Sequence, residues 1–183
     1  MAPPESVTGA WLKTIDWLRA NAPTSAATLN PPATDSDLHS LADSLQAPLP
    51  QGLETLLRIN NGSGSPLLPD GGVFMDCKTT AQQYSRYVHI AEEGNDPDWW
   101  TPAWVPFAER PEGHEGFLLD TSHPACPVFS YTEADYPKPF APSLAHFLTW
   151  FTRALIHGDN PYGEPFAGRV ARVDDAALRW DWT

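Results

Sequence analysis

The sequence is poor in several features on which common classes of protein depend. Only two residues are cysteine, with no CxxC pair, so no disulfide framework is expected and Cys77 and Cys126 are predicted to be reduced and mostly buried. No run of about 18 apolar residues occurs, so no membrane span is expected. The N-terminus lacks the basic and apolar segments of a signal peptide, which predicts a cytoplasmic protein.

Positive charge is also scarce. Eleven Lys and Arg residues stand against 23 Asp and Glu residues, which gives a net charge of −12. A surface that neutralises phosphates needs the opposite sign, so nucleic acid and anionic membranes are poor direct partners. A basic protein partner fits better because an acidic surface attracts and complements it, although acidity alone also keeps a protein in solution.

Catalytic motifs are missing as well. The chain has no GxSxG, GxxxxGK[ST] or HExxH sequence and no EF-hand loop. The densest set of potential metal ligands comprises His114, Glu115, Asp120, His123 and Cys126. Their spread over two turns favours solvated histidines and a turn-capping Asp120 over a zinc site, and Cys126 precedes a strand, unlike a papain-like nucleophile. We therefore expect no catalytic residue, metal or other cofactor.

What the chain does contain indicates a folded core. Apolar residues make up 42% of the 183 residues, and eight tryptophans are among them. A chain of this length buries about 70% of the surface that its unfolded form exposes, so it needs no disulfide or metal for stability. Twenty prolines predict short elements joined by stiff loops.

The spacing of apolar residues predicts an α+β fold. Helices are expected at 7–21, 35–46, 50–60, 79–91 and 144–157, and strands at 72–76, 103–108, 116–120 and 127–131. The short connections favour antiparallel pairing, and Pro106 within the second strand indicates an edge or a bulge. We expect an antiparallel twisted sheet of about four to six strands flanked by helices.

The ends of the chain differ from the central part. Residues 1–21 are predicted to form a helical appendage that docks on the main body or on a partner, joined by a linker at 22–34 that is rich in Pro, Ala and Thr. The α+β domain is expected at 35–158. The C-terminal extension, 159–183, is expected to pack on the domain, pinned to the sheet by Trp180 and Trp182.

A series of landmarks resembles the SUKH superfamily, the Smi/Knr-type domains. The landmarks are a helix from Leu49-Pro50 to Asn61-Gly62, the strand Trp104–Ala108, the strand Gly116–Asp120, the strand Val128–Tyr131 and a last helix introduced by Ser143. The resemblance covers roughly residues 35–158. The chain departs from the family pattern at the turn 112–116, which is more acidic than the usual glycine-rich turn.

The resemblance implies a protein-binding domain without enzymatic activity. Most SUKH members are bacterial immunity proteins of polymorphic-toxin systems, which bind a cognate toxin and block it, while fungal relatives regulate cell-wall synthesis through protein contacts. We expect an immunity protein, with a regulatory scaffold as the alternative and an unrecognised enzyme or metal protein as the third hypothesis.

The segment EEGNDPDWW, residues 92–100, is the predicted partner-binding region, because aromatic residues flanked by charges are typical of interface hot spots. One tryptophan of the pair is expected to face the core. An acidic rim in the next loop could extend the contact, or could be a plain solvated turn. The predicted partner-binding residues are Glu92, Glu93, Asp96, Asp98, Trp99, Trp100, Glu109, Glu112 and Glu115.

Overall fold

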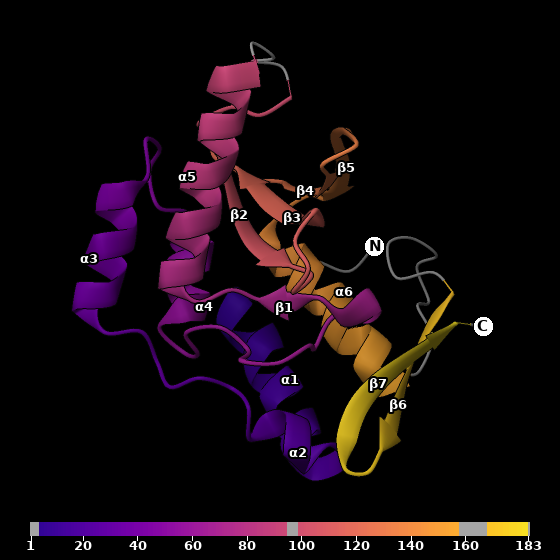
Figure 1. The fold of residues 1–183 in the computed structure, drawn as a ribbon. Coiled ribbons are helices and arrows are strands. Elements are labelled where there is room, and N and C mark those ends of the chain that lie inside the picture. Colours follow the sequence, from indigo (N-terminus) through magenta and orange to yellow (C-terminus); the bar gives the residue numbers. More distant parts are fainter. Residues whose placement is uncertain (1–3, 95–98, 158–167, 183) are drawn as a thin grey trace.

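A five-stranded antiparallel sheet forms the centre of the molecule (Figure 1). The computed structural model describes residues 4–94, 99–157 and 168–182. The strand order follows the chain: β1 (Val73–Phe74), β2 (Trp104–Glu109), β3 (Glu115–Asp120), β4 (Val128–Thr132) and β5 (Asp135–Ala141). The predicted α+β fold with a helix-flanked antiparallel sheet is confirmed.

Strand β5 was not among the predicted strands. It contains Pro137 and Pro139, which cannot donate to a ladder, and it occupies the edge of the sheet, where such residues are tolerated. Pro106 is accommodated by a bulge, since the register between β2 and β3 shifts between Pro106 and Ala108.

Helices cover both faces of the sheet. Helix α5 (Cys77–Gly94) lies on one face, where Tyr87 packs against Trp100 and Tyr131. Helix α6 (Leu144–His157) lies on the other, where Phe147 contacts Phe107 and Phe117. Helices α3 (Asp35–Ser44) and α4 (Gln51–Leu57) pack on α5 and α6, respectively.

The N-terminal helix is built into the core. Helix α1 (Val7–Asn21) packs along α6, and its Trp11, Ile15 and Leu18 are buried in the common apolar cluster. The following segment contains a short helix, α2 (Pro23–Ala26), and the buried residue Ala33. Residues 22–34 therefore contact the body of the protein along their course.

The C-terminal residues form a separate hairpin of β6 (Arg169–Asp174) and β7 (Ala177–Trp182). The indole nitrogen of Trp180 donates a hydrogen bond to the Leu67 carbonyl oxygen at 2.8 Å, and its ring lies 6.0 Å from that of Phe151 on α6. The tail is thus anchored to α6 and to the loop before β1. The side chain of Trp182 lies outside the described part of the structure.

Candidate protein-binding surface

The C-terminal end of α5 carries the first part of the predicted partner-binding region. The sequence predicted a helix over 79–91 and an acidic loop after it, but α5 runs from Cys77 to Gly94. It starts earlier because Asp76 caps it, accepting the Thr79 amide hydrogen bond at 2.6 Å. Glu92 and Glu93 consequently lie exposed on the last helical turn.

The next part of the predicted region contains the tryptophan pair. Asp96 and Asp98 lie outside the described residues. Trp100 is 2% exposed and stacks on Tyr87, with ring centroids 4.6 Å apart, so it belongs to the core. Trp99 is half-buried, and its ring meets that of Tyr87 edge-on at 5.9 Å. Trp99 is therefore the member of the pair that reaches the surface.

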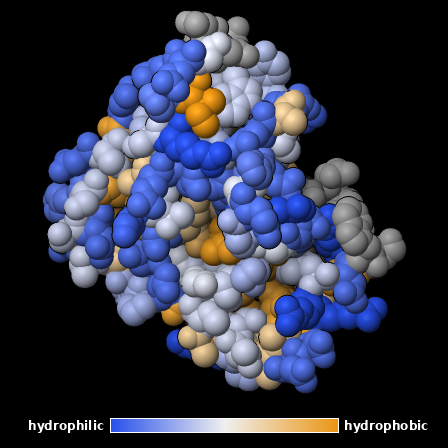
Figure 2. Space-filling model, in the orientation of Figure 1, coloured by the Kyte–Doolittle hydropathy of each residue, from blue (hydrophilic) through white to orange (hydrophobic). Residues whose placement is uncertain are grey.

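A shallow pocket of about 340 Å³ lies beside Trp99, lined by Arg86, Ile90, Ala91, Gly94, Trp99 and Glu133. Ile90 is 37% exposed, so it adds apolar surface beside the pocket. Figure 2 shows an apolar patch framed by hydrophilic residues over the upper part of α5. We define the α5 end surface as Ile90, Glu92, Glu93, Trp99 and Glu133.

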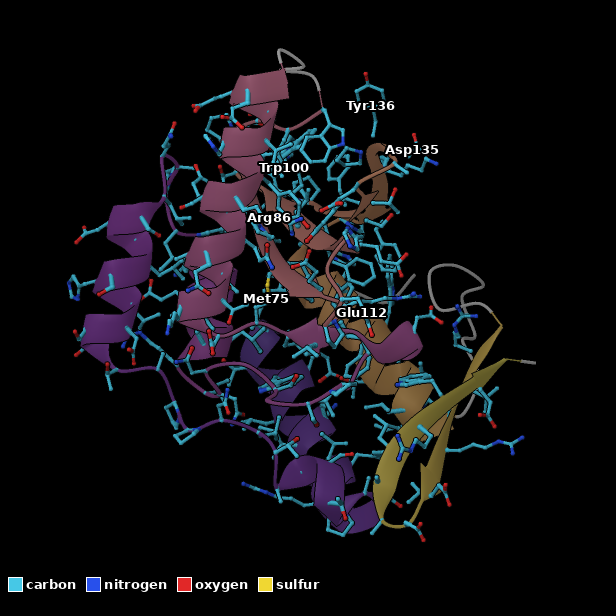
Figure 3. The ribbon with its side chains drawn as sticks, in the orientation of Figure 1. Met75, Arg86, Trp100, Glu112, Asp135 and Tyr136 are labelled. Carbon is cyan, nitrogen blue, oxygen red and sulfur yellow. The ribbon has the colours of Figure 1, made fainter. Side chains whose placement is uncertain are left out.

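The hairpin between β4 and β5 borders this surface. Its tip carries Asp135 and Tyr136, and the Tyr136 side chain is 54% exposed. Figure 3 shows both residues at the same end of the molecule as Trp100. This second aromatic group was missed from the sequence because the hairpin itself was missed, since Pro137 and Pro139 argue against a strand.

Acidic charge dominates the α5 end surface. The sequence from Tyr87 to Glu109 contains no Lys or Arg. Arg86, which precedes it, is held by Glu133 at 2.7 Å, and the His114 ring also contacts Glu133. Because the nearest arginine is already paired, the exposed carboxylates of Glu92 and Glu93 set the local potential.

The three glutamates of the predicted acidic rim, Glu109, Glu112 and Glu115, lie in different environments. Glu109 is 5% exposed at the end of β2, so its expected place on an exposed rim is wrong. Its carboxylate accepts a hydrogen bond from the Tyr87 hydroxyl, and burial raises its pKa. Glu112 is exposed on the β2–β3 turn, and Glu115 is paired with Arg110.

The potential metal ligands do not converge in the described residues, where no group of three or more His, Cys, Asp and Glu side chains could hold a metal ion. Asp120 caps the turn after β3, accepting hydrogen bonds from the Ser122 amide at 2.9 Å and hydroxyl at 2.6 Å. Burial raises the pKa of the Cys126 thiol, which is the opposite of what a nucleophile requires.

The fold defines a small α+β domain in which helices flank an antiparallel sheet. A family comparison identifies it further: residues 32–150 match the SMI1/KNR4 family (SUKH-1), which is more than half of the chain, and the chain belongs to this family. The family consists of immunity-type and regulator-type domains and is generally non-enzymatic. No curated protein matches the chain. No helix in the described residues is long and apolar enough to cross a bilayer.

Proposed function

We propose that this protein is an immunity protein that binds a cognate bacterial toxin and neutralises it through the α5 end surface. The observation that supports this proposal is that half-buried Trp99 and exposed Ile90 lie at the same end of α5 as the exposed Glu92 and Glu93 of its last turn. The chain belongs to a family that contains both immunity and regulatory domains, and this supports protein binding. The exposed carboxylates of the α5 end surface support a partner with a basic face.

The two kinds of residue have different roles in the proposed complex. Trp99 and Ile90 provide apolar area that loses water on contact, which slows dissociation. Glu92 and Glu93 attract a basic face, which speeds association at low salt. Inhibition follows if the bound domain covers the toxin's substrate cleft.

The first experiment identifies the partner by capture on the full-length protein from its native cell, followed by mass spectrometry. Association and dissociation rates are then measured for wild type and for the double variant Glu92→Lys, Glu93→Lys. We expect the association rate to fall at least tenfold at low salt and its salt dependence to flatten. A second double variant, Asp16→Lys, Asp43→Lys, makes the same charge change at exposed positions on α1 and α3 and should cause a much smaller loss.

The second experiment separates immunity from regulation. The toxin's own activity is measured with and without one equivalent of this protein. Loss of that activity at a 1:1 ratio supports immunity. A bound partner that keeps full activity contradicts it and favours the regulatory scaffold, the alternative within the family. An unchanged association rate for the Glu92, Glu93 variant would remove the α5 end surface from the proposal.

A further inference from the structure

The two β-sheets of the described residues end in four edge strands, which are β1, β5, β6 and β7. The outward N–H and C=O groups of an edge strand can pair with a further strand, and natural proteins usually close such edges. The loop before β1 closes the β1 edge, because the Phe74 carbonyl oxygen accepts a hydrogen bond from the Ser63 amide at 2.9 Å. The β5 edge is interrupted by Pro137 and Pro139, which have no N–H to donate.

Helix α2 closes the β7 edge. The Leu178 amide donates a hydrogen bond to the Ser25 hydroxyl at 2.9 Å. The Ala176 carbonyl oxygen, in the hairpin turn, accepts a hydrogen bond from the Thr24 amide at 2.9 Å. These three edges are therefore protected from pairing with another chain.

Strand β6 differs from the other three edge strands. The hairpin turns over two residues with positive φ, and the pair Asp174–Ala177 closes its ladder. Hydrogen-bonded pairs alternate along an antiparallel ladder, so the backbone groups of Ala171 and Val173 point away from β7. The same alternation points the backbone of Leu178 away from β6, in agreement with its hydrogen bond to α2.

The outward edge of β6 is open in the part of the chain that the structure describes. The N–H and C=O groups of Ala171 and Val173 form no hydrogen bond with another described residue. The register of β6 against β7 is regular from Arg169 to Asp174, without a proline or a bulge. Val173 is 44% exposed, so this part of the strand is accessible to another chain.

The charges along β6 are complementary to those of a second, antiparallel copy. Arg172 and Asp174 are exposed and point to the same face, because successive side chains of a strand alternate. When two copies pair about Val173, Arg172 of each copy lies opposite Asp174 of the other. Two ion pairs form, and the two Val173 residues meet on the axis, where they exchange two backbone hydrogen bonds.

The hairpin is also the part of the molecule where a second copy meets little repulsion. Residues 168–182 contain three arginines and three aspartates, so their net charge is zero and the rest of the chain carries the net charge of −12. We propose that β6 pairs with β6 of a second copy, so that the protein forms a two-fold symmetric dimer through its C-terminal hairpin.

This inference goes beyond the proposed function, and the hairpin lies outside the matched family residues 32–150. Figure 1 shows the hairpin at the lower right, away from the C-terminal end of α5 at the top. Both α5 end surfaces therefore stay free in the dimer, which would hold two toxin molecules. Because few residues pair, the buried area stays below the roughly 1,200 Å² at the lower limit of standard interfaces, and we expect a weak dimer.

Sedimentation equilibrium of the full-length protein, from micromolar to millimolar concentrations, tests the dimer. The weight-average mass should rise from the monomer value of 20.1 kDa toward twice that value. Hydrogen exchange of the Val173 amide should slow over the same range, because this amide gains a hydrogen bond, whereas the Leu178 amide already has one and should not change. A monomeric mass at millimolar concentration, or an unchanged exchange rate for Val173, would overturn the inference.

Two substitutions locate the contact. Asp174→Arg keeps the ion pair of Arg172 with Asp181, at 2.8 Å, but sets arginines against arginines across the axis. The dissociation constant should rise about tenfold or more. Asp43→Arg makes the same charge change at an exposed position on α3 and should dimerise as wild type does. Val173→Pro removes the outward N–H without taking a bond from β7 and should abolish the dimer, whereas Val173→Thr keeps the N–H and the dimer.

A charge exchange tests the pairing of Arg172 with Asp174 directly. The double variant Arg172→Asp, Asp181→Arg keeps the ion pair within the chain with its signs reversed and leaves two acids at the contact. Alone, it should dimerise as weakly as Asp174→Arg. Equal amounts of these two proteins should form a mixed dimer of about wild-type affinity, because every acid at the contact then faces an arginine. A mixture that stays monomeric contradicts the pairing.

The remaining outcomes identify other occupants of the edge. A dimer that persists in both Asp174→Arg and Val173→Pro uses another surface and overturns the inference. If wild type is monomeric but Val173→Pro no longer binds a captured toxin, the edge takes a strand of the toxin and the dimer is wrong. The sedimentation measurements need no toxin, so failure to find one leaves their result unchanged, and a monomeric protein leaves the effect of Glu92 and Glu93 on association as a separate measurement.

Discussion

The Tyr87 hydroxyl donates a hydrogen bond to the buried carboxylate of Glu109, joining helix α5 to the end of strand β2. Burial is the main cause that raises the pKa of both groups. Each group also affects the other. The Glu109 carboxylate raises the pKa of the Tyr87 phenol, whereas the hydrogen bond from the phenol lowers the pKa of the Glu109 carboxyl. The contact connects residues 22 positions apart in the chain and holds one face of the sheet to its helix.

The stability of the protein should depend on the charge of Glu109. Its folded pKa lies above the ordinary value of 4.5, so the folded state binds the proton more tightly than the unfolded state does. The free energy of unfolding should therefore fall as the pH rises from about 4.5 through the raised pKa. Urea unfolding at several pH values measures this, and Glu109→Gln should lack that component of the fall.

Glu112→Gln serves as the control for this pH dependence, because Glu112 is exposed on the neighbouring turn and should leave the profile unchanged. Tyr87→Phe should destabilise the protein by about 1–3 kcal/mol at neutral pH, since it leaves a buried carboxylate without its donor. If the free energy of unfolding of wild type and of Glu109→Gln had the same dependence on pH, Glu109 would titrate as an ordinary surface carboxyl.

Gly116 is required by the close approach of two strands. A Cβ atom at this position would lie 2.2 Å from the Ala108 carbonyl oxygen and 2.9 Å from the Tyr131 hydroxyl. Because the first of these atoms belongs to the backbone, the strands must separate to admit a methyl group. Gly116→Ala should cost about 3 kcal/mol in the free energy of unfolding.

The matched control is Gly94→Ala at the end of α5, where an added Cβ meets nothing within 4 Å. It should be neutral or stabilising by up to about 1 kcal/mol, since alanine restricts the unfolded chain and favours helix. Similar unfolding midpoints for the two alanine variants would contradict the assigned packing of β2 against β3.

Trp11 makes the N-terminal helix part of the core. It is 1% exposed, its ring meets Phe74 edge-on at 5.1 Å, and its indole nitrogen donates to the Asn60 side chain at 3.1 Å. Trp11→Ala should destabilise the protein by about 3–5 kcal/mol. Leu12→Ala, at the neighbouring exposed position, should change stability by less than about 0.5 kcal/mol in the same urea titration.

Removal of residues 1–21 tests whether the whole of helix α1 belongs to the core. The matched family region begins at residue 32, so the deletion leaves that region intact. We expect the shortened protein to lose its cooperative unfolding transition, because α6 and β1 would expose the surfaces that α1 covers. A truncated protein with wild-type stability would show that α1 is dispensable to the core.

Local patterns were sufficient to predict most of the helices and the central strands of the sheet. Helices α1 and α6 have the predicted bounds, because apolar residues recur at helical spacing along each of them and a capping residue marks where each begins. The meander β2–β3–β4 was also predicted, since each strand is a short apolar run between turn residues. Strand β5 was missed because Pro137 and Pro139 argue against a strand, and its position at the edge of the sheet explains why they are tolerated.

The properties of the candidate sites depend on tertiary contacts that no local pattern contains. Glu109 follows an apolar run and precedes Arg110, which in the sequence is typical of a strand ending in solvent. Its burial results from Tyr87 and from the missing side chain at Gly116, both distant in the chain. The prediction that one tryptophan of the pair faces the core was easier to make, because adjacent residues in an extended segment point to opposite sides.

The two cysteines should differ in reactivity, and both should be slow. Burial raises the pKa of Cys77 to about 11, with Asp37 and Asp76 adding to the effect, and burial also raises the pKa of half-buried Cys126. Because the thiolate is the reactive form, alkylation by iodoacetamide at pH 8 should label Cys126 first and Cys77 only after unfolding. Mass spectrometry of tryptic peptides distinguishes them, and rapid labelling of Cys77 in the folded protein would contradict its environment.

Trp99 is expected to act on the lifetime of the complex, in contrast to the neighbouring acids. A partly buried tryptophan that loses its remaining water on binding is a typical hot spot, and truncation of such a residue costs about 2 kcal/mol or more, which is roughly a thirtyfold loss of affinity. Trp99→Ala should therefore raise the dissociation rate of the captured partner with little change in association. Surface plasmon resonance at two salt concentrations separates this from the effect of Glu92→Lys, Glu93→Lys, which acts on association.

Trp99→Phe provides the graded comparison, because a smaller ring keeps the edge-on contact with Tyr87 while it loses part of the exposed area. Its dissociation rate should fall between those of wild type and Trp99→Ala. Leu12→Ala removes an exposed apolar side chain from α1 and should leave both rates unchanged. If Trp99→Ala and Leu12→Ala dissociate at the same rate, the partner does not contact the end of α5, and binding must be sought on another face of the domain.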